Sequence, residues 1–130
     1  MRGTVKFFNT SKGWGFITDT EGKDNFFYYL GIKMDGFKSL HEGDIVEFEI
    51  EQDTRGKEQA VNVTPIIMRK IVAHELSKEK LHLMRIKDDK GTHGWYVADK
   101  EDNPVVDKEM SLLEVAAYAG IDTEGLEAEL

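Results

Sequence analysis

The amino-acid sequence predicts a mainly β first half followed by a small α+β extension. Residues 14–18 alternate in side-chain type with the period of a strand, and a second aromatic stretch follows at residues 25–29. Residues 45–50 place apolar side chains at alternate positions with glutamates between them, as expected for a half-buried strand. Beyond residue 66, strand-like segments precede a pattern of helical spacing near residue 111.

We expect five strands in the first half, separated by segments rich in turn-forming residues. Along the first strand Val5 should face the core. The run Lys6-Phe7-Phe8 breaks the alternation, so we expect a bulge that turns both Lys6 and Phe7 outward. Pro65 marks the end of the last strand. The expected strands cover residues 2–9, 14–18, 25–29, 45–50 and 59–64.

The second expected strand has two different faces. Lys12, Trp14 and Phe16 share one face, and two glycines take the other. The third expected strand adds Phe26 and Tyr28 on one face. A planar ligand laid over these rings would explain why glycines lie behind them, and each nucleic-acid base that stacks on such a ring contributes about 1–3 kcal/mol. The competing interpretation makes these rings ordinary core aromatics of a small β-domain.

Familiar motifs run almost continuously through the first half: Gly3-Thr4-Val5-Lys6-Phe7-Phe8-Asn9, Lys12-Gly13-Trp14-Gly15-Phe16-Ile17, Asp24-Asn25-Phe26-Phe27-Tyr28-Tyr29, Gly36-Phe37-Lys38-Ser39-Leu40, Glu42-Gly43, Val46-Glu47-Phe48-Glu49 and Gln59-Ala60-Val61-Asn62-Val63. With these motifs, and one single-residue length difference near Lys57, residues 1–66 resemble a bacterial cold-shock domain. The resemblance implies a five-stranded OB-type antiparallel barrel that binds single-stranded RNA or DNA and is not an enzyme.

The resemblance also implies which side chains meet the nucleic acid. Successive bases are expected to stack on aromatic rings, while basic side chains meet phosphates or base edges. Asp24 is expected to accept hydrogen bonds from base amino groups, and Tyr29 either adds a platform or lies in the barrel wall. The expected stacking rings are Phe7, Trp14, Phe16, Phe26, Tyr28 and Phe37, and the expected cations are Lys6, Lys12, Lys38 and Arg55.

Three aromatic positions depart from the family pattern, and Phe27 and Leu30-Gly31 stand where small residues, a valine and a Ser-Ala pair, are usual. Phe7 stands where a tryptophan is usual, Trp14 where a phenylalanine is usual, and Tyr28 where a histidine is usual. Flat rings are kept at all three, so stacking should survive, but the pH response of a histidine is lost. By occupying unstacked bases, such a protein would melt weak RNA hairpins without ATP. The resemblance therefore implies an RNA chaperone or a regulator of transcription or translation.

The charge of −8 argues against binding through bulk electrostatics, because residues 1–66 contribute −3 and residues 67–130 contribute −5. We therefore expect a modest salt dependence of binding. The chain has no cysteine, its four histidines are scattered, and it contains no nucleophile motif or phosphate-binding glycine loop, so no metal, cofactor or catalytic site is expected. Without a signal peptide or a membrane-spanning apolar run, the protein is expected to be cytoplasmic.

Residues 67–130 are expected to form a separate α+β domain beside the 1–66 domain. Residues 66–76 could extend the last strand or begin a helix, and residues 81–106 suggest a small antiparallel meander. Ser111 and Glu114 form a capping-box pattern ahead of helical spacing, and Gly120 is a natural residue to follow the helix. A second short helix could begin at Asp122 and include Leu126.

Residues 109–130 carry six acidic side chains and neither lysine nor arginine, so this end of the chain should repel phosphate. Its apolar residues could pack within the second half, on the barrel, or in a homodimer or other protein contact. Two rival functions remain open. The whole chain could be a protein-interaction module on a barrel that has lost nucleic-acid binding, or residues 67–130 could hide an enzyme, for which no constellation is found.

Overall fold

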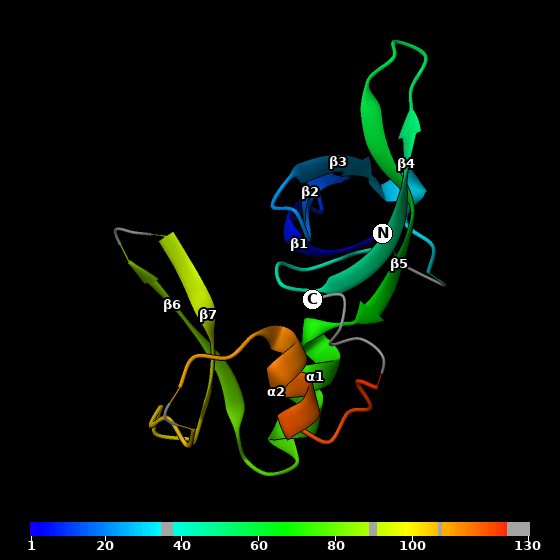
Figure 1. Cartoon of the computed structure of the whole chain (residues 1–130). Helices are drawn as coiled ribbons and strands as arrows, with labels where there is room; N and C mark the ends of the chain where they lie inside the picture. Colours follow the sequence, from blue (N-terminus) through cyan, green and yellow to red (C-terminus); the bar gives the residue numbers. More distant parts are fainter. Residues whose placement is uncertain (35–37, 89–90, 107, 125–130) are drawn as a thin grey trace. The chain divides into compact units, whose positions relative to one another are not determined.

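A computed structural model describes residues 1–34, 38–88, 91–106 and 108–124 of the chain. The chain forms two compact units that part between Met68 and Arg69, and each unit is described by itself (Figure 1). Among the described residues, no helix is long and apolar enough to cross a membrane.

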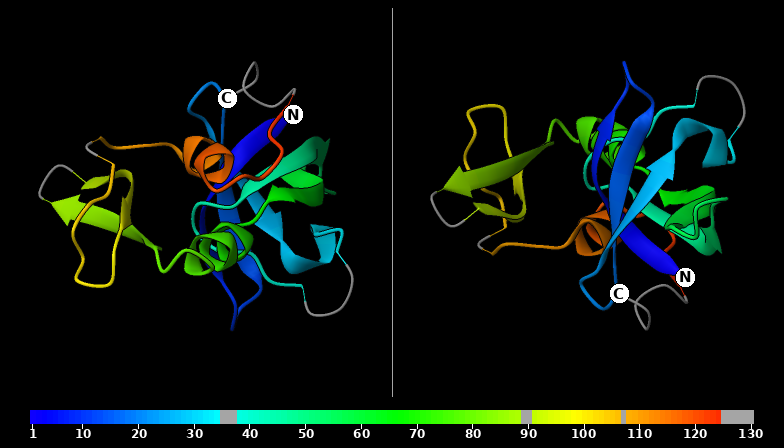
Figure 2. Two further views of the ribbon diagram at one scale, coloured as in Figure 1. Left: turned by 90° about the horizontal axis from the view of Figure 1, so that it is seen from below. Right: turned by 90° about the horizontal axis from the view of Figure 1, so that it is seen from above.

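The first unit is a closed barrel of five strands, in the order β1-β2-β3-β5-β4 (Figure 2). The strands are β1 (Arg2–Asn9), β2 (Trp14–Asp19), β3 (Asp24–Tyr28), β4 (Ile45–Gln52) and β5 (Glu58–Ile67). Four of the five neighbouring pairs are antiparallel, and β3 closes the barrel by pairing parallel to β5 at Phe27 and Ala60. The prediction of a five-stranded OB-type barrel is confirmed, with one parallel pairing where only antiparallel ones were expected.

The interior of the barrel is filled by large apolar side chains from every strand. Phe27 and Phe48 are fully buried, and the ring of Phe8 stacks on Phe27 with centroids 5.6 Å apart and planes 14° apart. The rest of the buried cluster consists of Val5, Ile17, Ile32, Leu40, Val46, Ala60 and Val63. Because these residues fill the barrel, the other aromatic side chains of β1 to β3 have no room inside it.

A bulge in β1 sets the direction of the first aromatic side chains. The register of β1 against β2 shifts between Val5 and Phe7. Lys6 and Phe7 are both exposed as a result, and Phe8 returns to pack against the core. The outward direction predicted for Lys6 and Phe7 is therefore confirmed, and it follows from the extra residue that a bulge inserts.

The two glycines of β2 and the turn before it have structural roles that the sequence interpretation missed. A Cβ atom on Gly15 would lie 2.3 Å from the carbonyl oxygen of Phe7 and 3.0 Å from the ring of Phe27. Gly13 has φ +75°, and the ring of Tyr29 lies where a Cβ would project, 2.6 Å away. Close contacts with β1, Phe27 and Tyr29, and not only an external ligand, thus explain the glycines behind the rings.

We predict that Gly15→Ala destabilises the protein by about 1–3 kcal/mol, because the added methyl group forces β1 away from β2. Gly31→Ala is the matched control: its Cβ would meet its nearest neighbour at an ordinary 3.4 Å, and its φ is not in the left-handed region. The control should change stability by about 0.5 kcal/mol or less. Urea unfolding measures both variants, and equal losses would contradict the close approach over Gly15.

The second unit contains α1 (Arg69–Ser77), β6 (His82–Asp88), β7 (Gly91–Ala98) and α2 (Leu112–Tyr118). Strands β6 and β7 form an antiparallel hairpin, and Met110 adds a single bridge to Trp95. Trp95 is buried, and two guanidinium groups lie over its ring, with central carbons 5.2 Å (Arg69) and 4.4 Å (Arg85) from the ring centroid. The expected meander is a two-stranded hairpin with isolated bridges. The expectation that Pro65 ends the last strand is wrong, because β5 pairs with β4 through Pro65 and continues to Ile67. Residues 66–67 thus extend the strand and α1 begins at Arg69, so each alternative for residues 66–76 holds for part of the segment.

Helix α2 has the two ends that its sequence predicts. The Ser111 side chain accepts from the backbone N–H of Glu114, and the Glu114 carboxylate accepts from the backbone N–H of Ser111, which completes a capping box. At the other end Gly120 has φ +88°, and the N–H of Ile121 donates to the carbonyl of Ala116 at 2.9 Å. Residues 122–124 are not helical, and residues 125–130 of the second expected helix lie outside the described residues.

Candidate nucleic-acid interface

Three neighbouring strands of the barrel carry five aromatic rings that contact one another on its outer side. Strand pairing places Phe7 of β1 opposite Phe16 of β2, and Phe16 opposite Phe26 of β3. Trp14 of β2 lies opposite Tyr28 of β3 in the same ladder. These five residues, Phe7, Trp14, Phe16, Phe26 and Tyr28, are called the aromatic surface below.

The rings of the aromatic surface support one another mostly edge to face. Phe7 meets Trp14 at 5.2 Å between centroids with planes 78° apart, and Phe26 meets Tyr28 at 4.6 Å and 88°. Trp14 and Phe26 are closer to parallel, at 5.9 Å and 30°. Such contacts hold each ring in one orientation while leaving part of its face uncovered.

Exposure differs between the edge and the middle of the aromatic surface. Phe7 is 37% exposed and Tyr28 is 47% exposed, whereas the other three rings are half-buried. An exposed apolar patch of this kind on a small protein marks a binding surface more often than a defect of packing. Five of the six rings predicted to stack on bases therefore lie together, and the sixth, Phe37, lies outside the described residues.

Tyr29 lies apart from the five contacting rings. It begins the short 3₁₀ helix η1 (Tyr29–Gly31), its N–H donates to the carbonyl of Gly13 at 2.8 Å, and its side chain is 46% exposed. The ring lines a hollow of about 480 Å³ together with Lys12 and Lys38. Of the two expectations for Tyr29, this position outside the barrel favours a platform over a place in the wall.

Lys6 and Asp24 were predicted to meet the ligand separately, but the structure joins them. The Lys6 ammonium lies 2.7 Å from Oδ2 of Asp24, and the hydroxyl of Thr18 donates to Oδ1 at 2.8 Å. These two hydrogen bonds hold the pKa of the Asp24 carboxyl below its usual range, with the bond from Lys6 as the larger cause. The pair stands beside the aromatic surface, because Thr18 and Asp24 face each other across β2 and β3.

We predict that Asp24→Asn weakens binding of oligocytidylate about fivefold more than binding of oligothymidylate, because only cytosine offers an amino group to the carboxylate. The lowered pKa keeps Asp24 ionised well into acid, so this preference should persist at about pH 5 and disappear only as the pH falls through the folded-state pKa.

Fluorescence anisotropy with labelled oligonucleotides measures both affinities. Asp102→Asn, which makes the same charge change at an exposed site of the second unit, is the control. An equal change for both oligonucleotides would mean that Asp24 acts only by holding Lys6.

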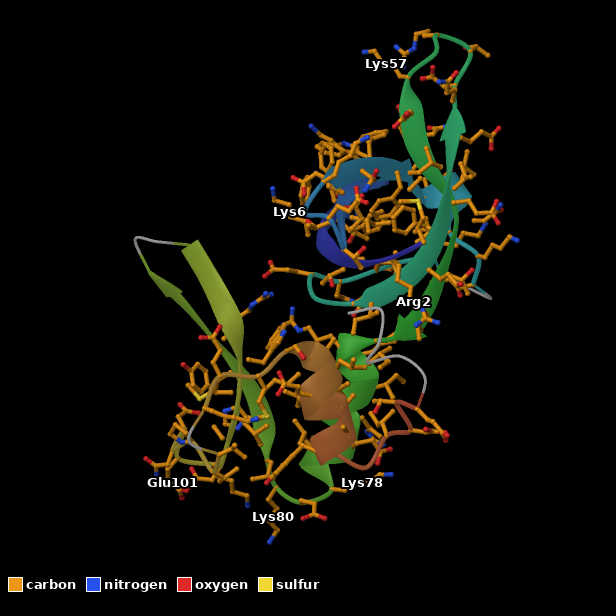
Figure 3. All side chains as sticks on the ribbon, in the orientation of Figure 1. Arg2, Lys6, Lys57, Lys78, Lys80 and Glu101 are labelled. Atoms are coloured by element: carbon orange, nitrogen blue, oxygen red, sulfur yellow. The ribbon has the colours of Figure 1, made fainter. Side chains whose placement is uncertain are left out.

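Of the remaining predicted cations, Lys12 and Lys38 line the hollow beside Tyr29, and Arg55 lies elsewhere. Lys12 is exposed in the turn before β2, where its backbone N–H donates to the Asn9 side chain, and Lys38 is half-buried. Arg55 lies in the turn between β4 and β5 and pairs with Asp53 at 3.2 Å. Figure 3 shows Lys57 of the same turn at the outer end of that hairpin, whereas Lys6 lies beside β1. The structure therefore does not gather Arg55 with Lys6.

Within the described part of the chain, no group of three or more histidine, cysteine or acidic side chains is arranged to hold a metal ion. The sequence reasoning also missed an apolar side chain at the edge of the site. Leu30 is 74% exposed directly after Tyr29, and with Tyr28 it lines a second hollow that runs along β5. The departure of Leu30 from the small residue that is usual at this position was the signal in the sequence, but it led to no prediction of a role at the site.

Comparison with known proteins places this barrel in a family. The family model described as 'Cold-shock' DNA-binding domain matches residues 1–66. The cold shock-like protein of Thermotoga maritima is 52% identical over 60 residues, which are 46% of this chain and 91% of that protein. Cold shock protein 1 of Lactiplantibacillus plantarum is 52% identical over 63 residues, 48% of this chain and 94% of that protein. Cold shock protein CspC of Bacillus subtilis is 53% identical over 62 residues, 48% of this chain and 92% of that protein. The chain therefore belongs to the cold-shock domain family, through its first half.

Proposed function

We propose that this protein binds single-stranded RNA or DNA without catalysis, by stacking successive bases on the aromatic surface. The observation that carries the proposal is the set of five mutually contacting rings on one side of three neighbouring strands. Every base has a π-face, so a row of flat rings can accept bases of any sequence. Membership of a family described as DNA-binding supports the same function.

Stacking, rather than charge, has to supply most of the affinity. The chain carries a net charge of −8, and two of the four predicted cations already pair with carboxylates, Lys6 with Asp24 and Arg55 with Asp53. A duplex hides the faces of its bases, so it could meet only the cations. We therefore expect a preference for single strands and a weak dependence on salt.

A protein that binds in this way favours the unstacked state of a nucleic acid. By mass action it shifts weak hairpins toward their open form, and this requires neither ATP nor a catalytic group. The chain would thus act as an RNA chaperone, and through the same opening of hairpins it could regulate transcription or translation. The absence of strong electrostatic binding suits this role, because the protein must also release its ligand.

We predict that Phe16→Ala and Phe26→Ala each weaken binding of an oligopyrimidine single strand by about 1–3 kcal/mol. The slope of log affinity against log salt should have a magnitude of about 2, as for roughly three phosphate contacts on a single strand. Fluorescence anisotropy at several salt concentrations measures both quantities, and circular dichroism checks that the barrel is retained.

Tyr118→Ala is the matched control for these variants, because it removes a ring that is 50% exposed in the second unit. It should leave the affinity unchanged, and a duplex of equal length should bind much more weakly to every protein. Normal binding by both phenylalanine variants together with loss of binding at high salt would contradict stacking on the aromatic surface.

For the second unit we propose a role in protein contact, by self-association or by docking to another protein. Its acidic side chains Glu109, Glu114 and Glu124 disfavour phosphate, and residues 109–124 include neither lysine nor arginine. The apolar residues of α2 are largely used inside the unit, since Leu112 and Val115 are buried and α2 packs on α1 and β7. Exposed apolar side chains remain for a partner at Ile71, Val105 and Tyr118.

We propose further that residues 1–66 and 67–130 are separate domains, so a chain that ends after Met68 should keep its affinity for single strands to within about tenfold. The relatives support independent folding of the barrel, because matches of 60 to 63 residues cover 91% and 94% of two of them. Anisotropy gives the affinity, and sedimentation of both forms reports self-association. A larger loss of affinity would overturn this division of roles.

A further inference from the structure

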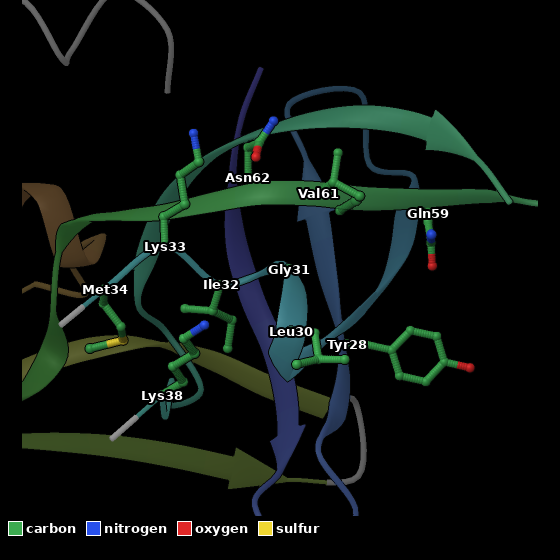
Figure 4. A pocket seen from close by; sticks show the side chains of 11 residues that line it. Tyr28, Leu30, Gly31, Ile32, Lys33, Met34, Lys38, Gln59, Val61 and Asn62 are labelled. Carbon is green, nitrogen blue, oxygen red and sulfur yellow. The ribbon is translucent and has the colours of Figure 1, made fainter. Parts of the chain in front are cut away.

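The barrel contains a hollow between η1 and β5 that the aromatic surface does not explain (Figure 4). It arises from the way β3 leaves the sheet. Phe27 pairs with Ala60 and Ile32 pairs with Val63, so the four residues 28–31 run beside the two residues 61–62. The extra residues bulge outward as η1, so the segment after β3 and strand β5 separate between the two pairings. The resulting cavity has a volume of about 860 Å³, within the range of ligand-binding clefts.

One end of this hollow belongs to the aromatic surface. Figure 4 shows the ring of Tyr28 and the side chain of Gln59 at that end, with Leu30 between them and the rest of the hollow. Leu30 is 74% exposed, more than any other large apolar side chain that the structure describes. An apolar side chain kept in water beside an exposed ring favours a flat, partly apolar ligand that covers both.

The other end of the hollow is cationic. Lys33 and Lys38 stand there with Met34, as Figure 4 shows. Among the described residues that line the hollow, none carries a carboxylate, although the chain as a whole has eight more acidic than basic groups. Asn62 also lines the hollow, and its side-chain amide donates a hydrogen bond to Glu49 at 3.2 Å. This end therefore suits a phosphate, with the amide of Asn62 beside it for a base edge.

We propose that a single strand bound on the aromatic surface continues past Tyr28 into this hollow, where one further base covers Leu30 and its phosphates meet Lys33 and Lys38. The inference rests on the proposed function, because the hollow alone is too open to hold a short nucleotide. The proposal predicts that affinity still rises when the single strand has more nucleotides than the aromatic surface can hold. This gain in affinity should depend on residues outside that surface.

The test compares oligothymidylates of about four and about eight nucleotides on the full chain by fluorescence anisotropy. Lys33→Gln and Leu30→Ser should bind the short strand as the unchanged protein does. Each should weaken binding of the long strand by about three- to tenfold. The backbone N–H of Lys33 keeps its bond to Val63 in the first variant, so the fold is not at risk.

Two controls match these variants in the second unit. Lys100→Gln removes the same charge from an exposed turn, and Val105→Ser removes an apolar side chain that is 44% exposed. Both should bind the long strand normally. If neither strand binds the unchanged protein, the proposed function itself fails. If the short strand binds but the long one is no tighter, or if Lys33→Gln behaves as Lys100→Gln does, the hollow is not part of the path and this inference is overturned.

Discussion

The bulge between Val5 and Phe7 determines how the rings of this barrel are divided between its inside and its outside. Regular alternation would send Phe7 inward with Val5 and leave Phe8 outside. The interior already holds Phe27 and Phe48, and the ring that β1 adds to them is that of Phe8. The extra residue turns Phe7 out beside Trp14, 5.2 Å away, and returns Phe8 to stack on Phe27. One irregularity of the backbone thus completes the core and the aromatic surface together.

Keeping these rings outside is unfavourable in water, and the structure limits that cost in two ways. Edge-to-face contacts cover part of each ring. The neighbouring ion pair between Lys6 and Asp24 is solvated, with side-chain exposures of 59% and 37%, so it contributes little to stability and can be exchanged for a phosphate contact at small cost. The surface is therefore stable when empty and retains its capacity to bind.

The sequence predicted what depends on near neighbours in the chain. Alternation along β2 and β3 placed Trp14, Phe16 and Phe26 on one side, and the capping box of Ser111 placed the start of α2. It could not show why Gly15 is a glycine, because the clash that excludes a side chain comes from the Phe7 carbonyl on another strand. Nor could it show the parallel pairing of Phe27 with Ala60, since that contact joins residues far apart in the sequence.

Tyr28 and Lys38 each border two parts of the candidate site. Tyr28 ends β3, where its ring is held by Phe26 at 4.6 Å on one side and opens toward the hollow along β5 on the other. Lys38 lines that hollow and also the one beside Tyr29, so one cation is within reach of a ligand in either. Lys12, Lys33 and Lys38 thus line the hollows beside the rings. In a chain of charge −8, the proposed function would leave binding strength to the rings and use these charges to guide the strand between them.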